Sequence, residues 1–142
     1  MTAEALATAR VERILPAAPD AVYAAWVEPE ALARFIAPAP GTAQVEIDPR
    51  VGGRLRIVMT FPDRVTEIEG TYLALDRPHR ISFSWRPLRA GFDSVVTVAL
   101  APHGEGQTRM TITHSRLPQE WLGSYETGWG SIADALGRLT RR

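Results

Sequence analysis

Short connections between successive strand-like segments constrain the fold of this chain more than any other feature of its sequence. Six runs of alternating apolar and polar residues follow one another between Thr42 and His114, and Pro, Gly or Asp residues separate most of them. A parallel pair of strands needs a crossover of about a dozen residues or more, which these connections lack. The runs therefore predict antiparallel hairpins.

Each predicted strand has one apolar face. The six runs span 42–47, 54–61, 65–75, 80–85, 92–100 and 108–114, and a further run at 8–15 precedes them. Within 54–61, for example, Leu55, Ile57 and Met59 alternate with polar or less apolar residues, which places them on one side of the sheet. A sheet with one apolar face must cover it with another layer.

Two segments change to a helical period and supply that layer. Pro19 suits a first helical turn and Pro29 forces a break, which predicts two short helices after the first strand. From 118 to 140 the large apolar residues fall within an arc of about 100°, which predicts a long C-terminal helix across the sheet. This stripe consists of Trp121, Leu122, Tyr125, Trp129, Ile132, Leu136 and Leu139. The predicted class is α+β, a helix-grip fold with a curved antiparallel sheet of about seven strands.

One domain accounts for the chain. At 142 residues, folding would bury about 70% of the extended chain's surface, which is enough for a core. The alanine-rich residues 1–7 are predicted to be a flexible N-terminus and residues 8–142 a single domain. No stretch has the character of a signal peptide or a membrane span, so we expect a cytoplasmic location and no membrane partner.

Composition excludes several kinds of chemistry. The chain has no cysteine, and all sixteen of its basic residues are arginine. Disulfides, thiolate nucleophiles and lysine Schiff bases are therefore excluded. A formal net charge of zero argues against nucleic-acid binding. We expect neither a cofactor nor a metal, because one well-placed histidine without cysteine supplies too few zinc ligands.

His114 is the one histidine with a candidate site, because His79 and His103 lie in predicted turns. It follows Met110 and Ile112 on the apolar face of its strand, so we expect it to point inward. Two interpretations stay open: a hydrogen-bonded histidine at the rim of the core, or a residue that orients a ligand. In an enzyme it would be the general base if its pKa stays near neutral.

Glycines interrupt the predicted terminal helix at Gly123, Gly128, Gly130 and Gly137. Each costs about 1 kcal/mol of helix preference relative to alanine. Close packing against a neighbouring element or a partner chain would offset this cost. The alternative is space for a ligand beneath Trp129.

Several short motifs occur in a characteristic order from about Arg10 to Leu139. They include EPEALARFIAP, Arg50-Val51-Gly52-Gly53, Phe83-Ser84-Trp85 and Gly128-Trp129. Together they resemble the START-like or SRPBCC superfamily and, within it, the group named after the activator of heat-shock protein 90 ATPase. The resemblance implies a helix-grip fold with a ligand-holding cavity. Members bind lipids, sterols, hormones and polyketides, some are cyclases or dehydratases, and many bacterial ones have no known function.

We therefore expect a small hydrophobic molecule to bind between the sheet and the terminal helix. Trp26 and Trp85 are predicted to be core residues. A cyclase, dehydratase or hydrolase using His114 in the same cavity remains an alternative. So does a co-chaperone-like ATPase activator, although Phe35-Ile36 stands where the family often has a tryptophan pair. A homodimer through the sheet edge or the glycines also stays open. The residues expected to contact the ligand are Met59, Tyr72, Phe83, His114, Trp121, Tyr125 and Trp129.

Overall fold

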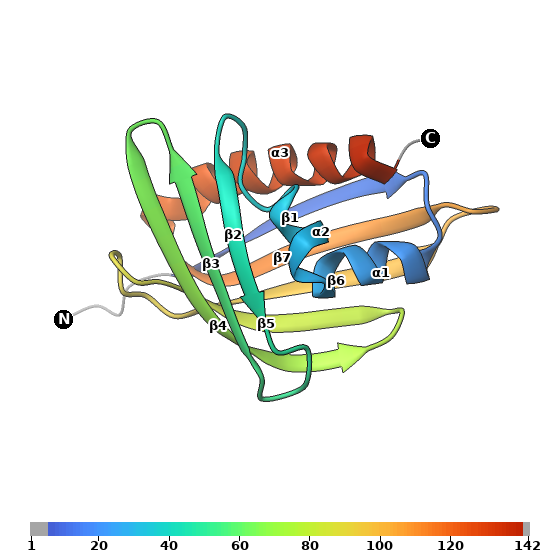
Figure 1. Cartoon of the computed structure of the whole chain (residues 1–142), viewed down its shortest axis with the longest axis horizontal. Helices are drawn as coiled ribbons and strands as arrows, with labels where there is room; N and C mark the ends of the chain where they lie inside the picture. Colours follow the sequence, from blue (N-terminus) through green and yellow to red (C-terminus); the bar gives the residue numbers. More distant parts are fainter. Residues whose placement is uncertain (1–5, 141–142) are drawn as a thin grey trace.

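Residues 6–140 are described by a computed structural model, in which one curved sheet carries three helices on its concave side (Figure 1). The sheet has seven strands in the order β1-β7-β6-β5-β4-β3-β2. Every neighbouring pair is antiparallel, as the short connections require. The strands are β1 Leu6–Leu15, β2 Thr42–Ile47, β3 Arg54–Phe61, β4 Arg64–Asp76, β5 Arg80–Pro87, β6 Ser94–Pro102 and β7 Thr108–Pro118.

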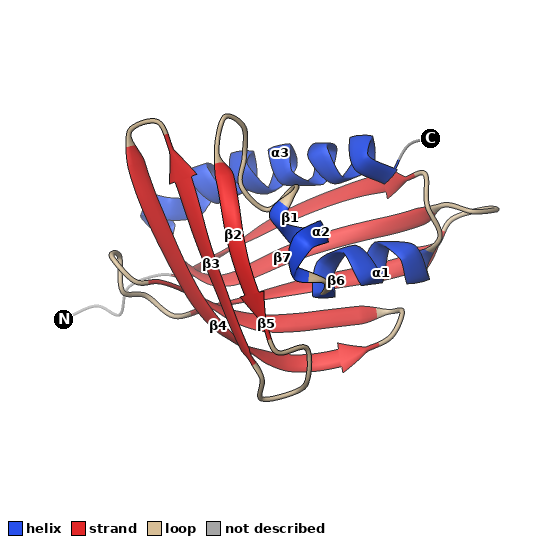
Figure 2. Ribbon diagram, viewed as in Figure 1, coloured by secondary structure: helices blue, strands red, loops and turns tan. Residues whose placement is uncertain are grey.

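The helices occupy the predicted places. The helices are α1 Pro19–Val27, α2 Pro29–Ala33 and α3 Leu122–Thr140. Each of the first two begins with its proline, where the missing N–H is not needed. Figure 2 shows α3 lying along β1 while α1 and α2 cover the other side of the concave face. No helix within residues 6–140 is long and apolar enough to span a membrane.

The ends of β1 and β7 differ from the prediction. The terminal helix does not begin at Pro118: β7 continues to that residue, and a short 3₁₀ segment, Gln119–Trp121, precedes α3. The extension pairs with β1, which begins at Leu6, two residues before its predicted start. Residues 1–5 of the predicted flexible N-terminus lie outside the described residues.

A bulge lets this extension bend. Ala7 pairs with Leu117 and Ala9 with His114, so β7 holds one residue more than β1 at this point. Arg116 lies in the bulge with φ 63°, a left-handed conformation that non-glycine residues seldom adopt.

Close contact between β4 and β5 accompanies the curvature of the sheet. A Cβ atom added at Gly70 would clash with the carbonyl oxygen of Ser84, so only glycine fits there. The neighbouring Thr71 N–H donates to the Ser84 hydroxyl at 2.9 Å. In Figure 2, β2, β3 and β4 run at a steep angle to β1, β6 and β7. Side chains from all three helices, among them Trp26, Leu32 and Trp129, belong to the buried core.

Part of the predicted α3 stripe enters the core. Trp129, Ile132 and Leu136 are buried, whereas Trp121 and Leu139 are 38% and 48% exposed. Trp26, predicted as core, is 1% exposed, and its ring lies 6.3 Å from that of Trp129. The second half of α3 thus packs in the core, and its first half is more open.

Candidate functional site

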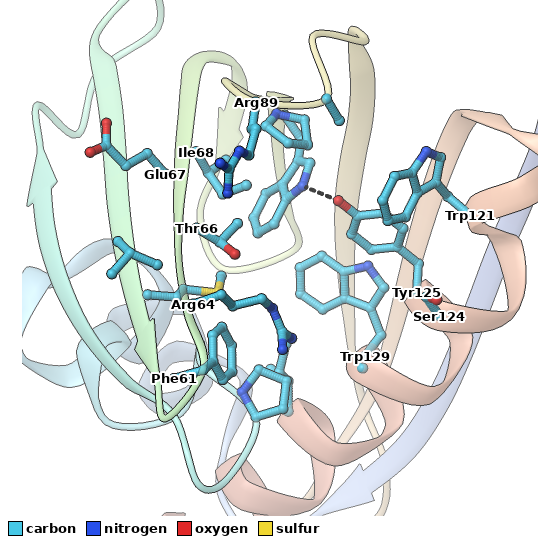
Figure 3. A pocket seen from close by; sticks show the side chains of 18 of the residues that line it. Phe61, Arg64, Thr66, Glu67, Ile68, Arg89, Trp121, Ser124, Tyr125 and Trp129 are labelled. Carbon is cyan, nitrogen blue, oxygen red and sulfur yellow. Dashed lines mark hydrogen bonds between the residues drawn. The ribbon is translucent and has the colours of Figure 1, made fainter.

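A cavity of about 440 Å³ lies between the first half of α3 and strands β3, β4 and β5 (Figure 3). This volume falls in the range of about 300–1,000 Å³ that is common for small-molecule sites. The polar lining residues are Arg64, Thr66, Glu67, Arg89 and Ser124. The remaining lining residues, most of them apolar or aromatic, are Pro38, Met59, Phe61, Val65, Ile68, Trp85, Pro87, Ala90, Phe92, Trp121, Tyr125, Gly128, Trp129 and Ile132.

The segment between β5 and β6 forms one wall of this cavity. It is held by hydrogen bonds from the Leu88 N–H to the Glu67 carbonyl at 2.9 Å and from the Gly91 N–H to the Pro87 carbonyl at 2.8 Å. The ring of Phe92, which follows, packs 6.0 Å from Trp121 and 6.3 Å from Tyr125. This loop and the start of α3 therefore meet through aromatic contacts.

Four of the seven predicted contact residues line the cavity. They are Met59, Trp121, Tyr125 and Trp129. Their position agrees with the prediction, and their contact with a ligand stays a prediction. Trp85, predicted as core, is 2% exposed and also lines the cavity.

Tyr72 and Phe83 lie outside the cavity, in the packed core. Their rings meet edge to face at 6.0 Å, and they are 1% and 2% exposed. Burial, and to a lesser extent the nearby Tyr23 of α1, raises the pKa of Tyr72. Both residues do point inward, as alternation predicts. Alternation defines a face of the sheet and not a position along the strand, so it does not indicate that they lie outside the cavity.

Several lining residues were not predicted. Phe61 shares its strand face with Met59, so the alternation of β3 contained a signal for it. Ser124 precedes Tyr125, and nothing in the helical stripe distinguishes it. Arg64 and Phe92 lie beside turns, where periodicity carries no information about direction.

His114 lies behind the cavity and uses both ring nitrogens within the protein. Its Nδ1 accepts the indole N–H of Trp129 at 2.9 Å. Its Nε2 lies 2.7 Å from the Ser94 hydroxyl, which donates to the carbonyl of Trp85 at 2.8 Å. Since an indole nitrogen can only donate, Nδ1 must be unprotonated and Nε2 must carry the proton. The network therefore specifies a neutral imidazole.

This arrangement does not suit the general-base role considered for His114. The residue is fully buried, and burial lowers its pKa to about 3. Its one basic lone pair already accepts the Trp129 hydrogen bond, so it cannot receive a proton from a molecule in the cavity. His114 instead orients Trp129. The interpretation as a hydrogen-bonded histidine at the rim of the core agrees with this geometry.

Tyr125 presents the one phenol of the cavity. Its oxygen accepts the Trp85 indole N–H at 3.0 Å (Figure 3). Within residues 6–140 its own hydroxyl proton has no acceptor. Burial raises the pKa of Tyr125, so the hydroxyl stays protonated and can donate.

The glycines of α3 divide between the two interpretations. Gly128 lines the cavity, and a Cβ added there would meet nothing within 4 Å. Gly130 and Gly137 face β1, where an added Cβ would lie 3.5 Å from Arg13 and 3.6 Å from Leu15, both ordinary contact distances. Gly128 therefore leaves space in the cavity, while the other two lie at the helix–strand interface without being required by it.

The described part of the chain contains no group of three His, Asp or Glu side chains arranged to hold a metal ion. The polar groups of the cavity are instead two guanidinium groups, hydroxyl groups and one carboxylate. They can bind and orient a molecule through charge and hydrogen bonds.

Comparison with known proteins gave one family and several solved structures. The family model described as Activator of Hsp90 ATPase homolog 1-like protein matches residues 16–141. Protein CV1439 from Chromobacterium violaceum is 30% identical, with a TM-score of 0.86 over 95% of this chain and 97% of that one. No curated protein matches.

Two more distant structures share the fold. Protein SA2116 from Staphylococcus aureus, described as of unknown function, is 20% identical, with a TM-score of 0.83 over 96% of this chain and 94% of its own. Protein Ms6760 from Mycobacterium smegmatis is 22% identical, with a TM-score of 0.80 over 94% and 90% of the two chains. At these identities the similarity concerns the fold alone.

Proposed function

We propose that this chain, which belongs to the family of Activator of Hsp90 ATPase homolog 1-like proteins, binds one small apolar molecule in the cavity beside α3. The observation that carries the proposal is the cavity itself, about 440 Å³ of space with aromatic walls. A phenol whose proton is free to donate lies in one wall. Small-molecule sites have this combination of apolar walls and a few placed polar groups.

Gly128 supports the same proposal. A glycine inside a helix costs about 1 kcal/mol relative to alanine, yet no neighbouring atom occupies the space beside it. Packing within the chain therefore gives no reason for this glycine. Room for a ligand against α3 would offset its cost.

The alternatives have weaker support. An enzyme of the cyclase, dehydratase or hydrolase kind depended on His114 as its base, and that side chain lies outside the cavity with both nitrogens in use. Activation of a chaperone ATPase belongs to the protein for which the family is named. For this chain it stays an alternative that would act through the outer surface.

Two helix variants test the binding proposal. Gly128→Leu puts a side chain into the cavity, whereas Gly123→Leu adds the same side chain at an exposed position of α3 where the added Cβ also meets open space. The neutral dye N-phenyl-1-naphthylamine should bind the wild type and Gly123→Leu with increased fluorescence. It should bind Gly128→Leu at least about tenfold more weakly, a loss of about 1.4 kcal/mol. Equal affinity for all three folded proteins would contradict the proposal.

Native mass spectrometry of the purified protein provides a second test. A co-purifying small apolar molecule would support binding. The same spectrum measures whether the chain forms a homodimer, which stays a prediction, as does its cytoplasmic location.

A further inference from the structure

We infer that the cavity selects apolar molecules that carry one carboxylate, which binds to Arg64 or to Arg89. This inference rests on the proposed binding function and specifies the class of ligand. Both arginines line the cavity, and Figure 3 shows their side chains extending into it. Guanidinium groups match carboxylates in geometry as well as in charge.

Arg64 is held over an aromatic wall. Its guanidinium carbon lies 4.3 Å from the centre of the Phe61 ring, which also lines the cavity. Its Nη1 lies 3.2 Å from a carboxylate oxygen of Asp63, but the Asp63 side chain is 76% exposed. An ion pair with so exposed a carboxylate is weak, so Arg64 keeps most of its capacity to bind an anion.

Arg89 comes from the opposite wall, in the loop after β5. Among the residues that the structure describes, its side chain has neither a hydrogen bond nor an ion pair. Asp93, a carboxylate of the same loop, lies 4.0 Å from Arg86 and does not line the cavity. Arg89 is exposed, and its charge has no partner within the described protein beside the apolar space.

Glu67, the carboxylate among the lining residues, is directed elsewhere. It lies 3.5 Å from Arg56 of the neighbouring strand. Alternation along β4 places it opposite to the buried Ile68, and in Figure 3 its carboxylate points away from the cavity. Two guanidinium groups thus face the cavity, and one of them is partly paired with Asp63. The remaining positive charge suits one negative charge on a ligand.

The apolar walls strengthen the attraction between this positive charge and a bound carboxylate. Charges attract each other more strongly near low-dielectric surfaces than in water. A hydrocarbon or aromatic body would occupy the space between Trp85, Trp129 and Met59, with its carboxylate at one of the two arginines. The Tyr125 hydroxyl on α3 remains available for a second acceptor on the ligand.

A matched pair of molecules tests this selectivity. Decanoate and 1-decanol share an apolar chain and differ in charge, and each would be titrated against bound N-phenyl-1-naphthylamine near neutral pH. The wild type should prefer decanoate by about tenfold, which corresponds to about 1.4 kcal/mol. Added salt should reduce the preference, because the arginines are partly solvated.

Variants of the two arginines test whether these residues produce the preference for decanoate. In the double variant Arg64→Gln/Arg89→Gln the preference for decanoate over 1-decanol should disappear, so that the ratio of the two affinities falls to about one. Arg54→Gln is the control, because Arg54 pairs with Glu69 at 2.8 Å and does not line the cavity. It should retain the wild-type preference.

The outcomes separate the two proposals. If the wild type binds the dye and both competitors with equal affinity, the carboxylate inference is wrong and the binding function stands. If the preference survives in the double variant or is lost in Arg54→Gln, its assignment to these arginines is wrong. If the wild type binds neither the dye nor either competitor, the proposed function fails and the inference fails with it.

Discussion

Acid should destabilise this protein more steeply than a variant without His114, because that imidazole is neutral in the fold. Burial lowers its pKa from 6.5 to about 3. Below the unfolded pKa the unfolded chain takes up a proton that the folded chain does not, so stability is lost as the pH falls through this window. One proton is worth about 1.4 kcal/mol per pH unit, and between about pH 6 and pH 4 the loss from His114 should be roughly 2.5 kcal/mol.

Urea unfolding followed by tryptophan fluorescence measures this loss. His114→Asn keeps an oxygen near the position of Nδ1 that can accept the Trp129 N–H, but it does not titrate. Its free energy of unfolding should therefore fall less steeply with acid than that of the wild type. His79→Asn removes an exposed imidazole and should follow the wild-type curve.

Parallel curves for the wild type and His114→Asn would refute the reasoning. An independent measurement covers the case in which the variant does not fold: the His114 ring protons of the wild type, followed by NMR, should show no titration near pH 6.5, the ordinary value for histidine. A midpoint there would mean that burial does not hold the imidazole neutral.

Three further variants test the fold and the wall of the cavity, each by its free energy of unfolding in urea. Gly70→Ala should lose about 2–3 kcal/mol, because its Cβ would clash with a β5 carbonyl; a neutral effect would contradict the close approach of β4 and β5. Arg116→Val should lose about 1–2 kcal/mol, because Arg116 has a positive φ that a β-branched residue adopts only with strain. Arg109→Val, at an exposed extended position of the same strand, should not lose stability, and equal effects of the two substitutions would argue against the bulge. Tyr125→Phe should lose about 1–3 kcal/mol by leaving the Trp85 N–H without an acceptor, and an unchanged stability would contradict that hydrogen bond.

Local turn chemistry made most of the sheet predictable. β2 and β3 have the predicted bounds, because Asp48-Pro49 follows β2 and Pro62 follows β3. The end of β7 was not predictable in this way. Leu117 and Pro118 have the character of a helix start, and only their position opposite Leu6 and Ala7 makes them part of a strand. Pairing between segments about a hundred residues apart leaves no local pattern.

The site was predictable in so far as it depends on periodicity. Helical spacing identified Tyr125 and Trp129, and alternation identified Met59. The same alternation also selected Tyr72, which does not line the cavity, because the position along β4 where the cavity ends depends on how the helices pack. The partners of His114 come from β6 and α3, so its neutral state follows from tertiary structure alone.

The division of α3 has a consequence for how relatives of this chain can diverge. Its second half is committed to the core through Ile132 and Leu136, whereas its first half meets the cavity through Tyr125 and Gly128. Substitutions at Gly128 are therefore expected to alter binding of the proposed ligand at a smaller cost in stability than substitutions at Ile132 or Leu136. One helix thereby combines a segment beside the cavity with a segment that the core requires.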